Sequence, residues 1–187
     1  MLRLFLLFIA YAVTPAAMSS VRLTEVPPHS LLSRYVGSGA YVDCYDTEVS
    51  GAVSHAQFVE AFYSTPLFKL ERLLLRLLAS RPSTDAEAKQ LARGERSSFA
   101  AWRVEARAAD EVLLSAGHTR SWLMVGPCLV RTSGTRLLFG SAVVHTPSSK
   151  SEGSSLGTTF AWLLPFHRVY SRALLLSAKS RLSSRPS

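Results

Sequence analysis

Four of the five histidines stand where an imidazole could carry out acid–base chemistry: His55, His118, His145 and His167. Histidine titrates near neutral pH, which makes it a common proton donor or acceptor in active sites. We expect His145, at the end of a strand, and His167, in the first turns of the last helix, to meet at the mouth of one cavity. The alternative is that all four are ordinary polar side chains, with His55 exposed at a helix start and His118 in a turn.

The motifs that usually accompany catalysis are missing from the sequence. No two histidines have the i, i+4 spacing or the H-E-x-x-H pattern of a metal site, and no G-x-S-x-G, G-x-G-x-x-G or P-loop pattern occurs. We therefore predict no metal and no cofactor, and an enzyme is disfavoured. Cys44 and Cys128 do not form a C-x-x-C pair, so two buried free thiols are favoured over one disulfide, which would require export.

The chain carries a formal charge of +8, mostly from arginine. An anionic partner would suit this charge, but solvated arginine faces are the favoured explanation. No run of basic residues is interleaved with aromatic ones, so a nucleic-acid partner is not predicted. Arg168 and Arg172 lie one helical turn apart and could hold an anionic head group, with two solvated arginines as the alternative.

The first 17 residues do not resemble part of a folded domain. An apolar run from Leu4 to Val13 follows Arg3, and small residues come after it, which is typical of a secretory signal peptide. The run is too short to cross a bilayer. The alternative is that Met18 is the true start, which would leave the protein cytoplasmic and remove its only route to membrane contact. The predicted division is a leader (1–17), an N-terminal segment (18–40), one domain (41–182) and a tail (183–187).

Periodicity predicts a strand followed by helices in the first half of that domain. Residues 41–46 alternate, with Tyr41, Asp43 and Tyr45 on one face of the strand. Capping-box spacing at Ser54-x-x-Gln57 predicts a helix to about residue 63. A second helix should begin at Thr65-Pro66, and a third at Thr84-x-x-Glu87, ending near residue 94.

Four consecutive strands and one long helix are predicted in the second half. The strands are expected at 100–107, 111–116, 121–131 and 137–145. The third is expected to be interrupted at Gly126-Pro127, either by a bulge or because it lies at an edge there. A loop at 147–157 precedes a helix over 160–182. Segregated strands and helices indicate an α+β fold. An antiparallel sheet wrapped on a long C-terminal helix is the helix-grip arrangement, which commonly encloses an apolar cavity where small molecules bind.

Two sets of residues are candidates to line such a cavity. Leu163, His167, Tyr170 and Leu174 follow one stripe of the last helix. Trp102 and Trp162 are further candidates, although core packing is the more usual role of tryptophan.

The strand acids Glu105 and Glu111 are expected on a solvated face or beside cross-strand partners. Arg103 and Arg107 are the partners that the strand pattern suggests. Periodicity places Glu105 on the opposite face from Trp102, so a shared pocket is not expected.

Several of these segments resemble a family of uncharacterised bacterial proteins known only as a domain of unknown function. The resemblance lies in residues 41–45, 58–63, 67–72 and 110–114 and in Pro165-Phe166-His167-Arg168. That family is grouped with the helix-grip, START-like and polyketide-cyclase-like proteins. The resemblance implies the fold and carries no catalytic motif, and it favours Met18 as the start.

Three functions remain open from sequence. The first is a non-enzymatic protein that holds an apolar or amphipathic small molecule between the sheet and the last helix. The second is a cyclase- or hydrolase-like enzyme that uses a cavity histidine. The third is an exported or peripheral membrane protein, which rests on the leader and the positive charge alone.

Overall fold

The computed structural model describes residues 20–69, 83–129, 133–144 and 155–184, with side chains of the last stretch from residue 164 onward. Its elements, in chain order, are β1 (Arg22–Leu23), η1 (Ser33–Tyr35), β2 (Tyr41–Val49), α3 (His55–Tyr63), α5 (Asp85–Ala92), β3 (Ser98–Phe99), β4 (Trp102–Arg107), β5 (Glu111–Ala116), β6 (Thr119–Pro127), β7 (Thr135–Val143) and α6 (Ser155–Ser183). Residues 1–17, with both hypotheses about them, lie outside the described residues. None of the described helices combines the length and apolar character that a bilayer crossing needs.

The strands form one antiparallel sheet of seven in the order β1-β2-β7-β6-β5-β4-β3. The first long strand, β2, pairs along its whole length with the last strand, β7. From β7 the sheet continues as a meander back to β3. The predicted α+β fold with a helix-grip-like plan is confirmed.

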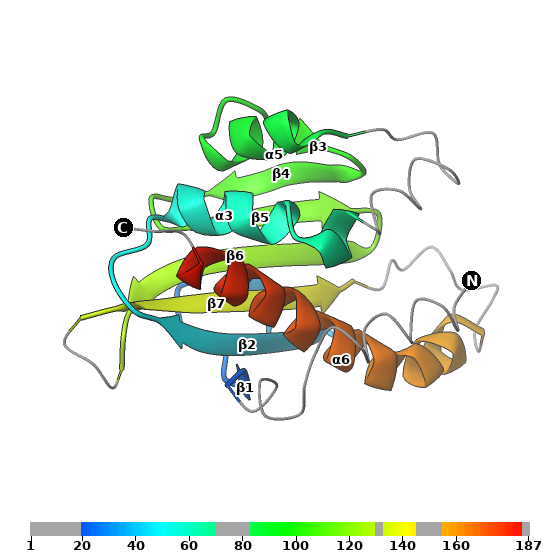
Figure 1. Ribbon diagram of the computed structural model, residues 1–187. Helices are drawn as coiled ribbons and strands as arrows, with labels where there is room; N and C mark the ends of the chain where they lie inside the picture. Colours follow the sequence, from blue (N-terminus) through cyan, green and yellow to red (C-terminus); the bar gives the residue numbers. More distant parts are fainter. Residues whose placement is uncertain (1–19, 70–82, 130–132, 145–154, 185–187) are drawn as a thin grey trace.

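Helices cover one face of this sheet. Figure 1 shows α3 and α6 crossing that face, with α5 beside α3 near β3, and α6 also packs on β2. Beneath them lies an aromatic core that includes Phe58, Phe62, Tyr63 and Phe139. We call this the helix face. The alternation predicted for β2 is confirmed, because Tyr45 belongs to this core and Cys44 to the core on the opposite side.

Both predicted capping boxes are present. Ser54 and Gln57 bond reciprocally at the start of α3, and Thr84 and Glu87 do the same at the start of α5. The helix expected at Thr65 begins as predicted, since the Thr65 hydroxyl accepts from the amide of Phe68 at 3.2 Å. Its continuation through 70–82 lies outside the described residues.

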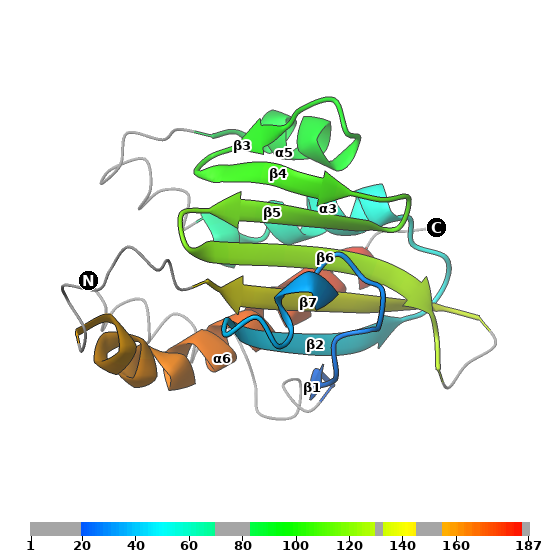
Figure 2. The same cartoon turned by 180° about the vertical axis from the view of Figure 1, so that it is seen from behind.

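The other face of the sheet, which we call the back face, is covered by residues 20–40. In Figure 2, which shows the sheet from this side, the segment crosses in front of β6 and β7. Leu32 is fully buried there beside Trp122 and Leu138. Gly140 in β7 permits this approach, because a Cβ added to it would lie 2.4 Å from Cδ2 of Leu32. The segment expected only as a loop before the domain is thus part of its packing.

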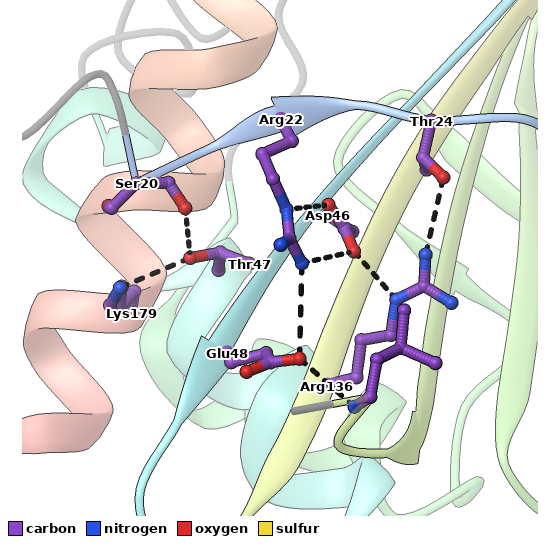
Figure 3. Close-up of polar contacts among 9 residues, drawn as sticks. Ser20, Arg22, Thr24, Asp46, Thr47, Glu48, Arg136 and Lys179 are labelled. Carbon is purple, nitrogen blue, oxygen red and sulfur yellow. Dashed lines mark hydrogen bonds and ion pairs between the residues drawn. The ribbon is translucent and has the colours of Figure 1, made fainter. Parts of the chain in front are cut away.

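A polar cluster at Asp46 joins β1 to the rest of the sheet (Figure 3). The Arg22 guanidinium donates to both carboxylate oxygens of Asp46 at 3.1 Å, and Nε of Arg136 donates to one of them at 2.7 Å. Burial opposes the ionised form, but these two arginines outweigh it and hold the pKa of Asp46 below its ordinary value. Lys179 of α6 reaches the same region by donating to the Thr47 hydroxyl at 3.2 Å.

Three details of the predicted strands were wrong. The β4–β5 register shifts between Val104 and Ala106, so Ala106 packs on the back face while Trp102 and Val104 pack on the helix face. Simple alternation over residues 100–107 would place all three on one face.

The short strand β3 was not predicted. The bulge at Gly126-Pro127 is wrong, because β6 pairs with β7 in continuous register up to Pro127, but the edge alternative holds, because pairing with β5 ends at Met124.

The last helix is longer than predicted. It begins at Ser155, inside the expected loop, so that Pro165 lies within it.

The disulfide alternative is also wrong. Neither Cys44 nor Cys128 is in a disulfide; the first is buried and the second partly buried.

Candidate functional site

A cavity of about 380 Å³ lies between the sheet and the helices that cover it. Aromatic side chains dominate its walls, and they come from α3 and the segment after it, from the sheet and from α6. They are Phe62, Phe68, Trp102, Phe139, Phe166 and Tyr170. Two of these, Phe166 and Tyr170 on successive turns of α6, are stacked with centroids 5.9 Å apart. The volume falls within the range of small-molecule sites, and the walls are of the mainly apolar kind that such sites have.

Four of the residues proposed from sequence line this cavity. Trp102 contributes from β4, and His167, Tyr170 and Leu174 contribute from α6, which is the stripe that helical spacing predicted. The side chains of Trp162 and Leu163 lie outside the described part of the chain. His145 does as well, so its meeting with His167 stays a prediction.

His167 joins a buried polar cluster at one side of the cavity. Its Nε2 lies 2.8 Å from the Ser141 hydroxyl and 3.4 Å from a carboxylate oxygen of Asp43. Ser141 donates to the other carboxylate oxygen at 2.6 Å. The hydroxyls of Tyr41 and Tyr45 also donate to Asp43, at 3.1 and 3.2 Å. The cluster therefore links β2, β7 and α6.

Asp43 is ionised in this cluster. Burial alone would raise its pKa, but the contact with His167 and the hydroxyl donors outweigh burial and hold the pKa of Asp43 below its ordinary value. An unprotonated Nε2 would direct a lone pair at this carboxylate, so we assign the proton of His167 to Nε2. His167 then donates to Ser141, which in turn donates to Asp43.

This geometry differs from that of a serine hydrolase. In a Ser-His-Asp triad the carboxylate holds one ring nitrogen while the other accepts the serine proton. Here Asp43 and Ser141 share the same nitrogen of His167, and that nitrogen is the donor. The cluster fastens α6 to the sheet and leaves Ser141 unactivated.

Two polar atoms in the cavity walls are buried without a hydrogen-bond partner among the described residues. They are the hydroxyl oxygen of Ser171 on α6 and the indole Nε1 of Trp102 on β4. Ser171 is only 1% exposed. Both atoms have almost no accessible surface, so neither faces the open space of the cavity.

The proposed anion pair lies against β2, and neither residue is among those that line the cavity. Arg168 is exposed, with Nε 3.5 Å from the Tyr41 hydroxyl, and the Arg172 guanidinium lies over the ring of Tyr45, 5.6 Å from its centroid. Anion binding by this pair stays a prediction.

His55 is not exposed as predicted. It is 8% exposed in the first turn of α3. Burial, and then the charge of Arg107, lower its pKa to about 4. His118 is exposed in the turn between β5 and β6, as expected.

Of the two strand acids, Glu105 is exposed as expected and Glu111 is not. Glu105 pairs with Arg120 at 2.6 Å and lies 3.8 Å from Arg34, so its partners are not Arg103 or Arg107. Glu111 is buried on the back face.

One carboxylate oxygen of Glu111 accepts two hydrogen bonds. They come from Nε1 of Trp122 at 2.6 Å and from the amide of Leu31 at 2.8 Å. Glu111 thus fastens the N-terminal segment to the sheet.

Sequence reasoning missed Asp43, Ser141 and Ser171 as parts of the site. Alternation had already placed Asp43 on one face of its strand with two tyrosines, and the same rule places Ser141 beside Phe139 on β7. The sequence does not reveal that these strands are neighbours, because β2 and β7 are separated by almost the whole domain along the chain.

No protein-family model matches the chain, and no curated protein matches its sequence. A solved structure, that of a conserved protein of unknown function from Enterococcus faecalis, is similar with a TM-score of 0.35 and 8% identity. The match covers 83% of each chain. Among the described residues, no group of three or more His, Cys, Asp or Glu side chains is arranged to hold a metal ion.

Proposed function

We propose that this protein binds one small apolar or amphipathic molecule in the cavity between its sheet and α6. The observation that carries the proposal is a cavity of about 380 Å³ with mainly aromatic walls. Aromatic walls favour an apolar ligand body.

The residues around the cavity favour binding over turnover. His167 is the histidine that lines it, and its Nε2 is engaged by Ser141 and Asp43. Without an activated nucleophile among the described lining residues, the hydrolase alternative has no support from this geometry. Membership of the START-like or polyketide-cyclase-like proteins stays a prediction.

The test is to fill the cavity without changing the rest of the fold. Ala116 ends β5 in the cavity wall, so Ala116→Trp places a large ring in a space of about 380 Å³. Binding is followed by the fluorescence of N-phenyl-1-naphthylamine, a neutral apolar dye. We expect Ala116→Trp to weaken dye binding at least about tenfold, which corresponds to about 1.4 kcal/mol.

The matched control is Ala108→Trp, at an exposed position away from the cavity. It should bind the dye as the unmodified protein does, and both variants should keep the far-UV circular dichroism of the parent. Equal dye binding by all three proteins would contradict the proposal, because the dye would then occupy another surface.

A further inference from the structure

Three polar side chains in the cavity walls already have partners. The hydroxyl of Ser121 shares a hydrogen bond with that of Tyr63 at 3.2 Å, and Ser141 donates to Asp43 at 2.6 Å. Both serines are buried, at 5% and 2% exposed. Nε2 of His167 is taken up by Ser141 at 2.8 Å. Recognition of a ligand therefore depends mainly on the carbon surface of the walls.

Three large aromatic residues of these walls keep accessible surface. Trp102 lies on β4, on the sheet side, and Phe166 and Tyr170 lie on α6. All three are only partly buried, whereas Phe62 and Phe68 in the same walls are 1% exposed and belong to the core. Because Nε1 of Trp102 is closed off, this residue offers a ligand the carbon face of its ring and no hydrogen bond.

Trp102 differs from the other aromatic residues of the walls in having no ring partner. Phe166 and Tyr170 stack on each other with their planes 11° apart, and Phe139 pairs with Phe62 at 4.8 Å between centroids. For Trp102, no contact with another ring or with a cation is found among the described residues. Paired aromatic rings are more stable than burial of their area alone accounts for. A ligand ring against Trp102 would therefore gain an interaction that a saturated ligand of the same size lacks.

We propose that the ligand carries a planar aromatic ring, which lies against the indole of Trp102 on the sheet side and faces Phe166 and Tyr170 on the helix side. Saturated rings and alkyl chains of the same size bind more weakly, although they are more hydrophobic. This inference rests on the proposed function, because it specifies the class of molecule in the same cavity.

Naphthalene and decalin test it, because they share one carbon skeleton and differ in whether it is aromatic. Their affinities are measured by displacement of N-phenyl-1-naphthylamine. Burial of apolar surface alone would favour decalin, which is the more hydrophobic of the two. We expect naphthalene to bind about three- to tenfold tighter than decalin, as one aromatic pair allows.

Two substitutions at Trp102 show whether its ring is the cause. Trp102→Phe keeps an aromatic ring and should retain the preference for naphthalene, whereas Trp102→Leu should lose it. Both variants should keep the far-UV circular dichroism of the parent. A preference retained in Trp102→Leu would overturn the inference.

The unmodified protein separates this inference from the proposed function. If decalin binds as tightly as naphthalene, and Ala116→Trp weakens binding of both, the cavity is a binding site but the inference of an aromatic ligand is wrong. If neither hydrocarbon displaces the dye, the inference and the proposed function fail together.

Discussion

Two tryptophans on opposite faces of the sheet show how differently its two sides are built. Trp122 on the back face is fully buried, and its indole N–H donates to Glu111 at 2.6 Å. Trp102 on the helix face lines the cavity, and its indole N–H has no partner among the described residues. The back face is closed by the chain's own N-terminal segment. The helix face keeps a cavity with aromatic walls, which is why we propose that a ligand binds on that side.

The largest effect on stability is expected at Glu111, which holds the N-terminal segment against the back face. Glu111→Leu removes the oxygen that accepts from both Trp122 and the Leu31 amide, and leaves two buried donors unpaired. We expect the free energy of unfolding in urea to fall by about 4 kcal/mol, since each unpaired donor costs about 1–3 kcal/mol. Glu111→Gln is the control, because its amide oxygen can keep both bonds. Equal stability of the two variants would contradict the role of Glu111.

An unpaired nitrogen on the helix side, away from the cavity, should make stability depend on pH. Nε2 of His55 is buried without a described partner, and burial lowers the pKa of His55 from 6.5 to about 4. The unfolded chain therefore binds the proton more readily, and stability is complete above about pH 6.5 and falls as the pH drops toward 4. The expected loss is about 3 kcal/mol.

The measurement for His55 is urea unfolding at pH 7 and pH 4.5. His55→Gln should remove most of this pH dependence, while His118→Gln, at an exposed turn, should keep it. A pH dependence that is unchanged in His55→Gln would show that other groups cause it.

A smaller effect is expected from crowding the back face. Gly140→Ala would place a Cβ 2.4 Å from Leu32 and 3.1 Å from the ring of Trp122, so the N-terminal segment must shift. We expect a loss of about 2 kcal/mol in the free energy of unfolding. Gly126→Ala in the neighbouring strand is the control, because no atom lies within 4 Å of its added Cβ. A loss as large in Gly126→Ala would mean that the cost is one of backbone conformation instead.

The smallest effect on stability is expected at the cavity. Trp102→Phe removes an N–H that has no described partner. The free energy of unfolding, measured by thermal denaturation, should therefore change by less than about 1 kcal/mol. Trp122→Phe removes the N–H that donates to the buried carboxylate of Glu111, so it should lower the free energy of unfolding by clearly more. If the two substitutions cost the same, the contrast between the two faces is wrong.

Local signals in the sequence were sufficient for most of the fold. Both capping boxes and the meander from β4 to β7 follow from patterns within a few residues of one another. The bulge near Glu105 breaks the alternation on which strand prediction depends. The packing of the N-terminal segment on the back face could not be predicted, because it depends on contacts such as that of Leu31 with Glu111, which lie 80 positions apart in the chain.

The site was predicted to the extent that it follows one helix. Helical spacing placed His167, Tyr170 and Leu174 on one stripe, and they line the cavity together. Asp43 and Ser141 join them only because β2 pairs with β7, which a single sequence does not reveal.

The central claim is that the cavity holds a small molecule, and native mass spectrometry tests it most directly. The protein is purified from its own host, and its native mass is compared with its denatured mass. We predict an added mass in the native spectrum that is lost on denaturation, and that is absent or strongly reduced in Ala116→Trp. A native mass equal to the denatured mass, or an adduct retained equally by Ala116→Trp, would contradict the account.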